Sequence, residues 1–307
     1  TVTQKAEQKA RREIRLLLEK CPDAAVIVTG CYAQLAAEEI AAIDERIAVL
    51  PGQLKDRLAL VPALLVKNTE QPVRFAQILR TTLFAQPAEK TGIAENSFKL
   101  ATDTFLAHSR SSIKIQDGCS NSCSYCAIHI ARGKSVSLGA DDVLERVTRL
   151  AETGQKEVVF TTVNIAQYRG AYNGSYITFT ELLELLLAKT EGIAFRISSL
   201  YPELVDKRFC EVIKNNRVRP HFHISVQSGS DSVLAAMNRH YKAEDVVKSV
   251  EMLRTVKDNP FFACDIIAGF PGETDEDFEQ TMDLCQKCGF AYVHAFPFSA
   301  RPGTAAY

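Results

Sequence analysis

Six short apolar segments alternate with helical segments from residue 111 onward, and this alternation limits the fold more than any other feature of the sequence. The segments are SIKIQD (112–117), EVVFTTV (157–163), AFRISSL (194–200), HFHISVQ (221–227), FFACDIIAGF (261–270) and YVHAFPFS (292–299). Helical stretches such as FTELLELLLAK follow them. Alternation of this kind predicts a parallel sheet. Six units are two short of a closed eight-stranded barrel, so the sequence predicts an α/β fold with a partial (β/α)6 barrel over residues 109–307.

A smaller α/β segment precedes the predicted barrel. Residues 3–20 are rich in helix formers, and AAVIVT (24–29) and RIAVLP (46–51) have the composition of buried strands with a helix between them. Residues 67–108 lose this periodicity and hold polar clusters such as KNTEQP. We therefore expect a fragment of a small parallel α/β domain over residues 1–66. A linker that adds an edge strand or two follows over residues 67–108.

Composition narrows the class of protein. No apolar run approaches the roughly 18 residues of a membrane span, and an odd number of cysteines, nine, suits a reducing, cytosolic compartment with metal or catalytic thiols. The net charge of −1 gives no overall attraction to nucleic acid. The first helix nevertheless carries a basic cluster, which is either a solvated face or a face that contacts phosphates. Its members are Lys5, Lys9, Arg11, Arg12 and Arg15.

Three of the cysteines lie within one loop, QDGCSNSCSYCAIHIARG (116–133), directly after the first barrel strand. Barrels of this kind place their chemistry at the carboxyl ends of the strands. Cys119, Cys123 and Cys126 have the spacing C-x3-C-x2-C. A structural zinc site and an ordinary iron–sulfur ferredoxin both use four protein ligands. The loop therefore leaves one metal position open, or it borrows a fourth ligand such as His129 to form a Cys3His zinc site.

The loop, with Tyr125 before its last cysteine, resembles the signature of the radical S-adenosylmethionine (SAM) superfamily. In that superfamily three thiolates hold three irons of a [4Fe-4S] cluster, and the fourth iron chelates SAM. Soft thiolates select such clusters, and the cofactor then carries the difficult radical step. Relatives usually have proline at the position of His129, so this residue departs from the pattern.

Further motifs resemble one branch of that superfamily, the methylthiotransferases. They are VTGCYAQ (28–34), KIQDGC (114–119), QSGSDSVLAAMNRHY (227–241), DIIAGFPGETDEDF (265–278) and FPFSARPGT (296–304). These motif sequences are most similar to those of enzymes that convert N6-threonylcarbamoyladenosine in tRNA to its 2-methylthio form. Enzymes acting on isopentenyladenosine tRNA or on ribosomal protein S12 are less similar. The resemblance implies that a 5′-deoxyadenosyl radical from SAM removes hydrogen from C2 of the adenine. A sulfur methylated by a second SAM then comes from an auxiliary [4Fe-4S] cluster.

The resemblance also implies site residues and partners. The cluster ligands are Cys119, Cys123 and Cys126, and Cys31 matches one ligand of the auxiliary cluster. That cluster needs three cysteines, so we expect a chain truncated at both ends that lacks a complete auxiliary site. The implied partners are tRNA and an electron donor such as flavodoxin or ferredoxin. Motif positions suggest SAM contacts from Tyr125, Asn164, Ser198, Gln227 and Arg301, and no catalytic residue is assigned.

Two points stay open from the sequence. A zinc-stabilised nucleic-acid-binding protein that uses the basic helix is the alternative from another functional class. His221 and His223 alternate along one predicted strand and therefore share a face, where they either pack or contact a substrate.

Overall fold

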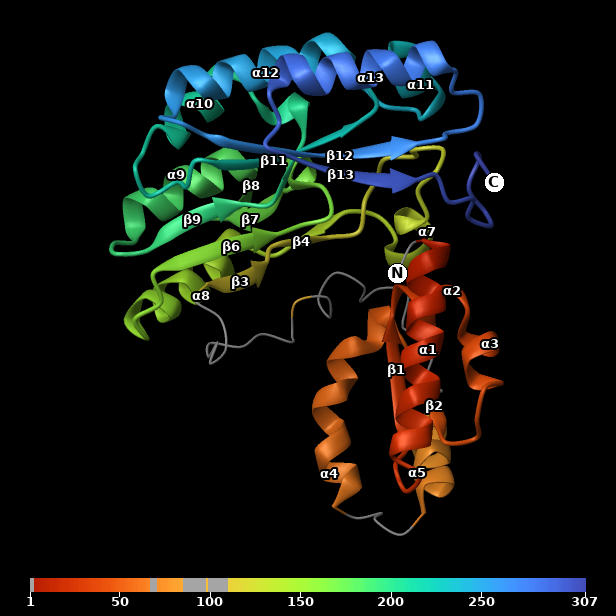
Figure 1. Cartoon of the computed structure of the whole chain (residues 1–307). Helices are drawn as coiled ribbons and strands as arrows, with labels where there is room; N and C mark the ends of the chain where they lie inside the picture. Colours follow the sequence, from red (N-terminus) through yellow and green to blue (C-terminus); the bar gives the residue numbers. More distant parts are fainter. Residues whose placement is uncertain (1–2, 67–70, 85–97, 99–109) are drawn as a thin grey trace.

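Six parallel strands form the larger body of the molecule, shown in the computed structural model of Figure 1, which describes residues 3–66, 71–84, 98 and 110–307. The order is β3–β6–β9 and then β10–β11–β12–β13, and every neighbouring pair is parallel. Only Ser198 separates β9 from β10, so the two sheets form one curved series. Within the described residues no ladder joins β3 to β13. The predicted partial (β/α)6 barrel is confirmed. Its six strands, with β9 and β10 counted as two segments of one, are β3 (Ser111–Lys114), β6 (Glu157–Thr161), β9 (Ala194–Ile197), β10 (Ser199–Leu200), β11 (His221–Gln227), β12 (Phe261–Ala268) and β13 (Tyr292–Pro297).

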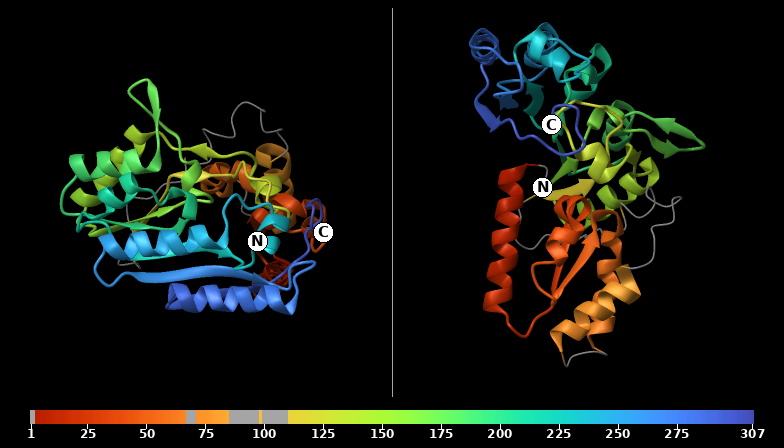
Figure 2. Two further views of the ribbon diagram at one scale, coloured as in Figure 1. Left: turned by 90° about the horizontal axis from the view of Figure 1, so that it is seen from above. Right: turned by 90° about the vertical axis from the view of Figure 1, so that its right-hand side faces the viewer.

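Helices cover the outer face of this series (Figures 1 and 2). Alternate strand residues face the helices and form the core, where the rings of Phe160 and Phe195 stack 5.6 Å apart and those of Phe222 and Phe262 stack 5.9 Å apart. Side chains alternate along a strand. On each strand, the residues directly before and after the phenylalanine therefore face the inside of the barrel. The covering helices are α8 (Ala140–Glu152), α9 (Phe179–Lys189), α10 (Lys207–Ile213), α11 (Asp231–Ala236), α12 (Ala243–Val256) and α13 (Asp275–Cys288).

Short elements surround the cysteine loop at the carboxyl end of β3. β4 (Gln116–Asp117) pairs antiparallel with β5 (Val136–Ser137) and closes the base of the loop. The helix α7 (Ile128–Arg132) lies inside the loop, and the helical turns η3 (Ile165–Gln167) and η4 (Pro202–Leu204) follow the next strands. A small hairpin, β7 (Gly170–Tyr172) with β8 (Ser175–Ile177), is an addition that the sequence analysis did not predict.

The N-terminal body is a second, smaller α/β unit. Its strands β1 (Val26–Gly30) and β2 (Ile47–Pro51) are parallel, as the sequence predicts. The helix α1 (Gln4–Lys20) packs Ile14 and Leu18 against this sheet. The remaining elements are α2 (Cys31–Leu35), α3 (Ala37–Ala41), η1 (Gly52–Leu60) and α4 (Val61–Leu65).

Part of the expected linker belongs to this N-terminal unit. Residues 72–84 form α5 (Pro72–Ile78) and η2 (Leu79–Phe84), whereas the sequence analysis expected an edge strand or two in this region. Phe75 and Leu79 pack against Ala48 of β2, and the Arg80 guanidinium donates to the Ile47 carbonyl oxygen at 2.9 Å. Polar residues surround this short segment in the sequence, so its composition did not indicate the single apolar face of the helix. Residues 67–70, 85–97 and 99–109 lie outside the described residues, and the boundaries at 66 and 109 stay predictions.

None of the described helices is both long enough and apolar enough to cross a membrane.

Candidate functional site

The cysteine loop begins at Gly118, where the backbone needs a glycine. Gly118 has a φ of +67°, and a Cβ at this position would lie 2.1 Å from the carbonyl oxygen of Lys134. The Cys119 amide then donates to the Gly133 carbonyl oxygen at 3.0 Å. These contacts bring the two ends of the loop together, so the three cysteines between them are held in a short, closed segment.

The three thiols of the loop lie close enough to influence one another. Cys119 and Cys123 are buried, and Cys126 is partly buried. Burial raises the pKa of the Cys119 thiol and raises that of Cys126 to about 11, and the charge of Cys123 contributes to both shifts. The Ile128 amide donates to Cys126 Sγ at 3.4 Å and lowers its pKa in part. The site is therefore a set of three neighbouring thiols, with a backbone amide that donates to one of them.

Arg239 is a member of the site that the sequence analysis missed. Its Nη1 donates to Cys123 Sγ at 3.4 Å, and its Nε donates to the Tyr241 hydroxyl at 2.9 Å. The guanidinium lies 5.0 Å from the ring centre of Tyr201 and 4.8 Å from that of Tyr241. These aromatic faces stabilise a partly buried cation. The basic residue in the NRHY motif was the available signal, but its partner lies 116 residues away.

The three sulfurs suit a [4Fe-4S] cluster better than a single zinc ion. Within the described part of the chain, no group of three His, Cys, Asp or Glu side chains is arranged to hold one metal ion. Zinc requires all its ligands at about 2.0 to 2.3 Å from one centre, whereas a four-iron cluster takes each thiolate on a different iron. His129, the possible fourth zinc ligand, has a buried Nδ1 without a hydrogen-bond partner among the described residues. His129 forms no such group with the three cysteines, so the Cys3His alternative is not favoured.

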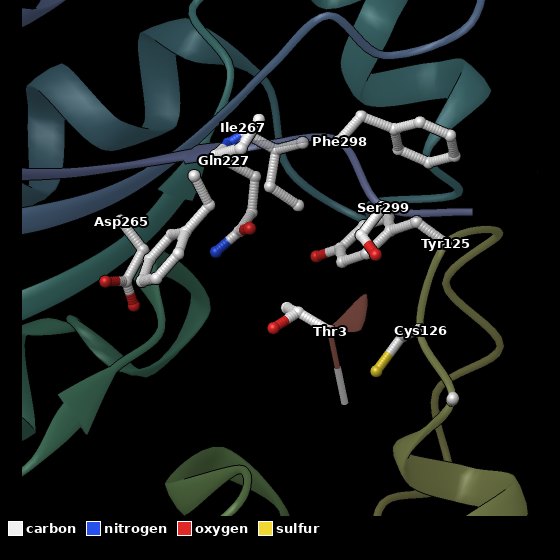
Figure 3. Close-up of a pocket in the computed structure, with 11 residues that line it drawn as sticks. Thr3, Tyr125, Cys126, Gln227, Asp265, Ile267, Phe298 and Ser299 are labelled. Atoms are coloured by element: carbon white, nitrogen blue, oxygen red, sulfur yellow. The ribbon is translucent and has the colours of Figure 1, made fainter. Parts of the chain in front are cut away.

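A cavity of about 200 Å³ opens beside the loop at the carboxyl ends of β11, β12 and β13 (Figure 3). Tyr125 and Cys126 line one side, and Asp265 lies at the opposite end of the lining. Gln227 lies between them at a bulge of β11, with a φ of +71° that turns it out of the regular strand. The full lining is Thr3, Tyr125, Cys126, Ala127, Gln227, Asp265, Ile267, Phe296, Pro297, Phe298 and Ser299.

The predicted SAM contacts divide into two groups. Tyr125 and Gln227 line the cavity, and the Asn164 side chain lies at Cys119, where its hydrogen bond lowers the thiol pKa in part. Ser198 lies next to Thr162, with their hydroxyl oxygens 3.5 Å apart. Arg301 is buried outside the lining and forms an ion pair with Glu7 of α1. The SAM roles of all five residues stay predictions.

Cys31, the expected auxiliary ligand, lies at the start of α2. It contacts Arg132 of α7, at the end of the cysteine loop. The Arg132 Nε donates to Cys31 Sγ at 3.4 Å, and its Nη1 pairs with Asp117 at 3.0 Å. Burial raises the pKa of the Cys31 thiol, but the positive charges beside it, including Arg132, lower it below its usual value. Cys21 is exposed at the far end of α1. A single thiolate does not complete a four-iron cluster, and the auxiliary role of Cys31 stays a prediction.

Sequence comparisons match both bodies of the chain. Residues 113–285 match the radical SAM superfamily, and residues 1–52 match an uncharacterized protein family, UPF0004. The chain is 45% identical to threonylcarbamoyladenosine tRNA methylthiotransferase MtaB of Treponema pallidum, over 100% of this chain and 72% of that protein. It is 36% identical to the MtaB of Thermotoga maritima, over 99% of this chain and 66% of the relative. A tRNA-2-methylthio-N(6)-dimethylallyladenosine synthase of Anaplasma marginale is 31% identical, over 99% and 64%.

Solved structures share the fold at low sequence identity. The cobalamin-dependent SAM radical enzyme OxsB has a TM-score of 0.55 at 12% identity, over 92% of this chain and 42% of that one. The radical SAM methyltransferase TsrM from Kitasatospora setae has a TM-score of 0.53 at 16% identity, over 64% of this chain and 35% of that one. These similarities support the barrel architecture alone. The substrate has to be inferred from the residues of the site.

Proposed function

Because this chain belongs to the radical SAM superfamily and, within it, to the tRNA methylthiotransferases, we propose that it adds a methylthio group to C2 of N6-threonylcarbamoyladenosine in tRNA. The observation that carries this proposal is the three-cysteine loop beside a cavity at the carboxyl ends of the strands. Methylthiolation of isopentenyladenosine tRNA is the second candidate, because a relative named for that reaction matches at 31% identity.

The chain's own residues have three tasks in this reaction. Cys119, Cys123 and Cys126 would hold a [4Fe-4S] cluster, and Arg239 places a positive charge beside Cys123. With a cluster and SAM bound, the site would supply radical chemistry at an unactivated C–H bond. Tyr125 and the apolar side chains around it would limit water in the cavity beside the loop, which would protect a reactive site from side reactions.

The sulfur donor and the partners belong to the proposal as well. Cys31 would provide one ligand of an auxiliary cluster, and a single thiolate does not complete such a site. The chain spans 72% and 66% of two MtaB relatives, which have further residues to contribute. We propose tRNA as substrate and a small electron donor, such as flavodoxin or ferredoxin, as reductant.

Replacement of Cys123 by alanine tests the assignment of the cluster. We expect the wild-type chain to take up about four irons at the barrel site after anaerobic reconstitution. The Cys123→Ala variant should lose the brown chromophore and SAM cleavage. Cys21→Ala is the matched control, because Cys21 is exposed and lies outside the loop. Full iron content in Cys123→Ala would contradict the assignment.

The substrate is tested by the product. The longest available form of the protein should convert N6-threonylcarbamoyladenosine in tRNA to its 2-methylthio form, measured by mass spectrometry of the nucleosides. A product found only in isopentenyladenosine tRNA would select the second candidate.

A further inference from the structure

The first half of the cysteine loop lies at the surface of the molecule. Cys119 and Cys123 are buried, whereas Ser120 and Ser122 between them are exposed. Both thiols are therefore one residue away from chain that faces solvent. Because electron tunnelling falls off steeply with distance, the surface nearest these thiols is the place where a donor of electrons would have to bind.

One flank of this exposed segment is fixed by hydrogen bonds to two neighbouring segments. The Ser120 amide donates to Gln167 Oε1 at 2.9 Å, and Gln167 Nε2 donates to Asn121 Oδ1 at 2.6 Å. The Ser135 amide donates to Ser120 Oγ at 3.2 Å. These contacts hold two basic side chains beside the segment. They are Lys134 and Arg169, and both are exposed.

The other flank is fixed by the turn that follows α11. Asn238 Nδ2 donates to the carbonyl oxygen of Ser122 at 3.0 Å and to its Oγ at 2.9 Å. The next residue, Arg239, donates to Cys123 Sγ. A partner would therefore meet a preformed surface, which lowers the entropy lost on binding. The rim surface, as we name it, consists of the exposed residues Ser120, Ser122, Lys134, Arg169, Asn238 and His240.

The rim surface is positively charged in a chain with a net charge of −1. The four segments that meet there are residues 118–124, 133–137, 164–170 and 236–240, and they contain no aspartate or glutamate. Arg169 Nη1 donates to the carbonyl oxygens of Ala166 and Tyr168, and these neutral partners fix the guanidinium without cancelling its charge. Asp117, just before the first segment, pairs with Lys114 at 2.8 Å and with Arg132 at 3.0 Å.

The rim surface is separate from the cavity beside the loop. Tyr125 and Cys126, in the second half of the loop, line the cavity (Figure 3). No residue of the rim surface belongs to this lining as the structure describes it. An RNA that places a base in the cavity would therefore contact the second half of the loop, and the first half stays available to another macromolecule.

We propose that the rim surface is the docking site of the electron donor, and that this donor is a small acidic electron-carrier protein. The inference rests on the proposed function and deepens it by naming the place and the charge of a partner. One electron would pass from the reduced donor to the oxidised cluster, and no bond or proton is exchanged. A small, polar contact suits a complex that must dissociate after each transfer. Opposite charges on the two surfaces accelerate the encounter.

Reversal of two charges tests the docking directly. The probe is an acidic flavodoxin in its oxidised form, and its binding to the holoenzyme is measured by isothermal titration calorimetry. The double variant Lys134→Glu, Arg169→Glu should bind roughly tenfold more weakly and with a flatter salt dependence, because exposed charges act through long-range attraction that salt screens. Lys207→Glu with Lys287→Glu is the matched control. Both lysines are exposed on the outer helices, so this equal change in net charge should alter the affinity less than twofold.

Two reductants separate docking from an effect on the cluster. Reduction of the cluster by reduced flavodoxin, followed by stopped-flow absorbance, should be slower in the double variant than in the control. Dithionite is a small ion that needs no protein docking site, so its final extent of reduction and the SAM cleavage that it drives should not change. Iron content is measured for every variant. If the double variant loses iron, Arg169→Glu alone, outside the cysteine loop, should show the same effect at smaller size.

The outcomes separate this inference from the proposed function. Equal flavodoxin affinity and equal reduction rates in the wild type, the double variant and the control overturn the docking site. A double variant that loses affinity for tRNA and keeps its affinity for flavodoxin shows that the rim surface binds RNA, which also overturns the inference. The proposed reaction stands in both cases. A wild type that flavodoxin reduces and that cleaves SAM, but that methylthiolates no tRNA, overturns the proposed function and leaves the docking site in place.

Discussion

At the scale of single residues, charge placement beside the thiols is the feature with the largest consequence. Arg239 is partly buried beside two tyrosine rings and donates to Cys123 Sγ. A guanidinium keeps its charge in such a place because its intrinsic pKa is so high. Positive charge and hydrogen bonds at cluster sulfurs favour the reduced state, and both set the potential of iron–sulfur centres. Arg239 should therefore ease the reduction on which SAM cleavage depends.

Substitution of Arg239 by glutamine tests this role. Loss of the charge and of the hydrogen bond should lower the midpoint potential of the barrel cluster by roughly 50 mV, a few-fold to tenfold change for a one-electron couple. An anaerobic redox titration followed by electron paramagnetic resonance measures it. Arg239→Lys keeps the charge and should fall between the two. If Arg239→Gln has full iron content and an unchanged midpoint potential, Arg239 does not influence the cluster.

At the scale of elements, the cysteine loop depends on how its ends are closed. Gly118 and the short β4–β5 ladder hold the start and the end of the loop together. The spacing of the cysteines is a property of the sequence, but their confinement to one compact loop requires this closure. A side chain at Gly118 would displace the Lys134 backbone and spread the loop.

Gly118→Ala should therefore impair cluster assembly more than it impairs folding. We expect a reconstituted variant to hold less than half of the wild-type iron, measured with its visible absorbance, because a 2.1 Å contact forces the Lys134 backbone out of place. Gly154→Ala is the matched control. Gly154 also has a positive φ, +87°, but no atom lies within 4 Å of the added Cβ. That control should cost about 1 kcal/mol of stability and keep its iron, and equal iron in the two variants would contradict the argument.

At the scale of the whole molecule, α1 connects the N-terminal body to the C-terminal end of the barrel. The Gln4 amide donates to Ser299 Oγ at 3.1 Å, and Glu7 pairs with Arg301. Thr3 thus reaches the cavity, and the helix runs away from it along the N-terminal body (Figure 1). Lys5, Lys9, Arg12 and Arg15 of the predicted basic cluster are exposed. Arg11 differs, because it contacts the Tyr32 hydroxyl at 3.2 Å and Glu39 at 3.5 Å.

The exposed part of this cluster should contribute to tRNA binding. Reversal of Arg12 and Arg15 to glutamate should weaken the affinity. It should also flatten the log–log salt dependence by about two contacts, a slope change of roughly 1.4 to 1.8. Lys207→Glu with Lys287→Glu is the control, because both lysines are exposed on helices that cover the outside of the barrel. Equal salt slopes for the two double variants would show that α1 faces only solvent.

The sequence by itself determined the elements and the ligand set. Apolar alternation predicted the six strands, because a strand must bury one face whatever lies next to it. The short spacing of Cys119, Cys123 and Cys126 similarly placed three thiols in one loop. Local patterns also indicated α1 and the β1–β2 sheet correctly. Local patterns did not indicate α5, because its apolar face can be recognised only from its packing against β2.

Only the tertiary structure decided which distant side chains meet. Arg239 reaches Cys123 across 116 residues, and Glu7 reaches Arg301 across 294. His223 and Asp265 face each other because β11 and β12 pair in one register. A shift by one residue would turn either side chain into the helix-covered core. Such contacts depend on sheet register and on the packing of two bodies, and neither leaves a periodic trace in the sequence.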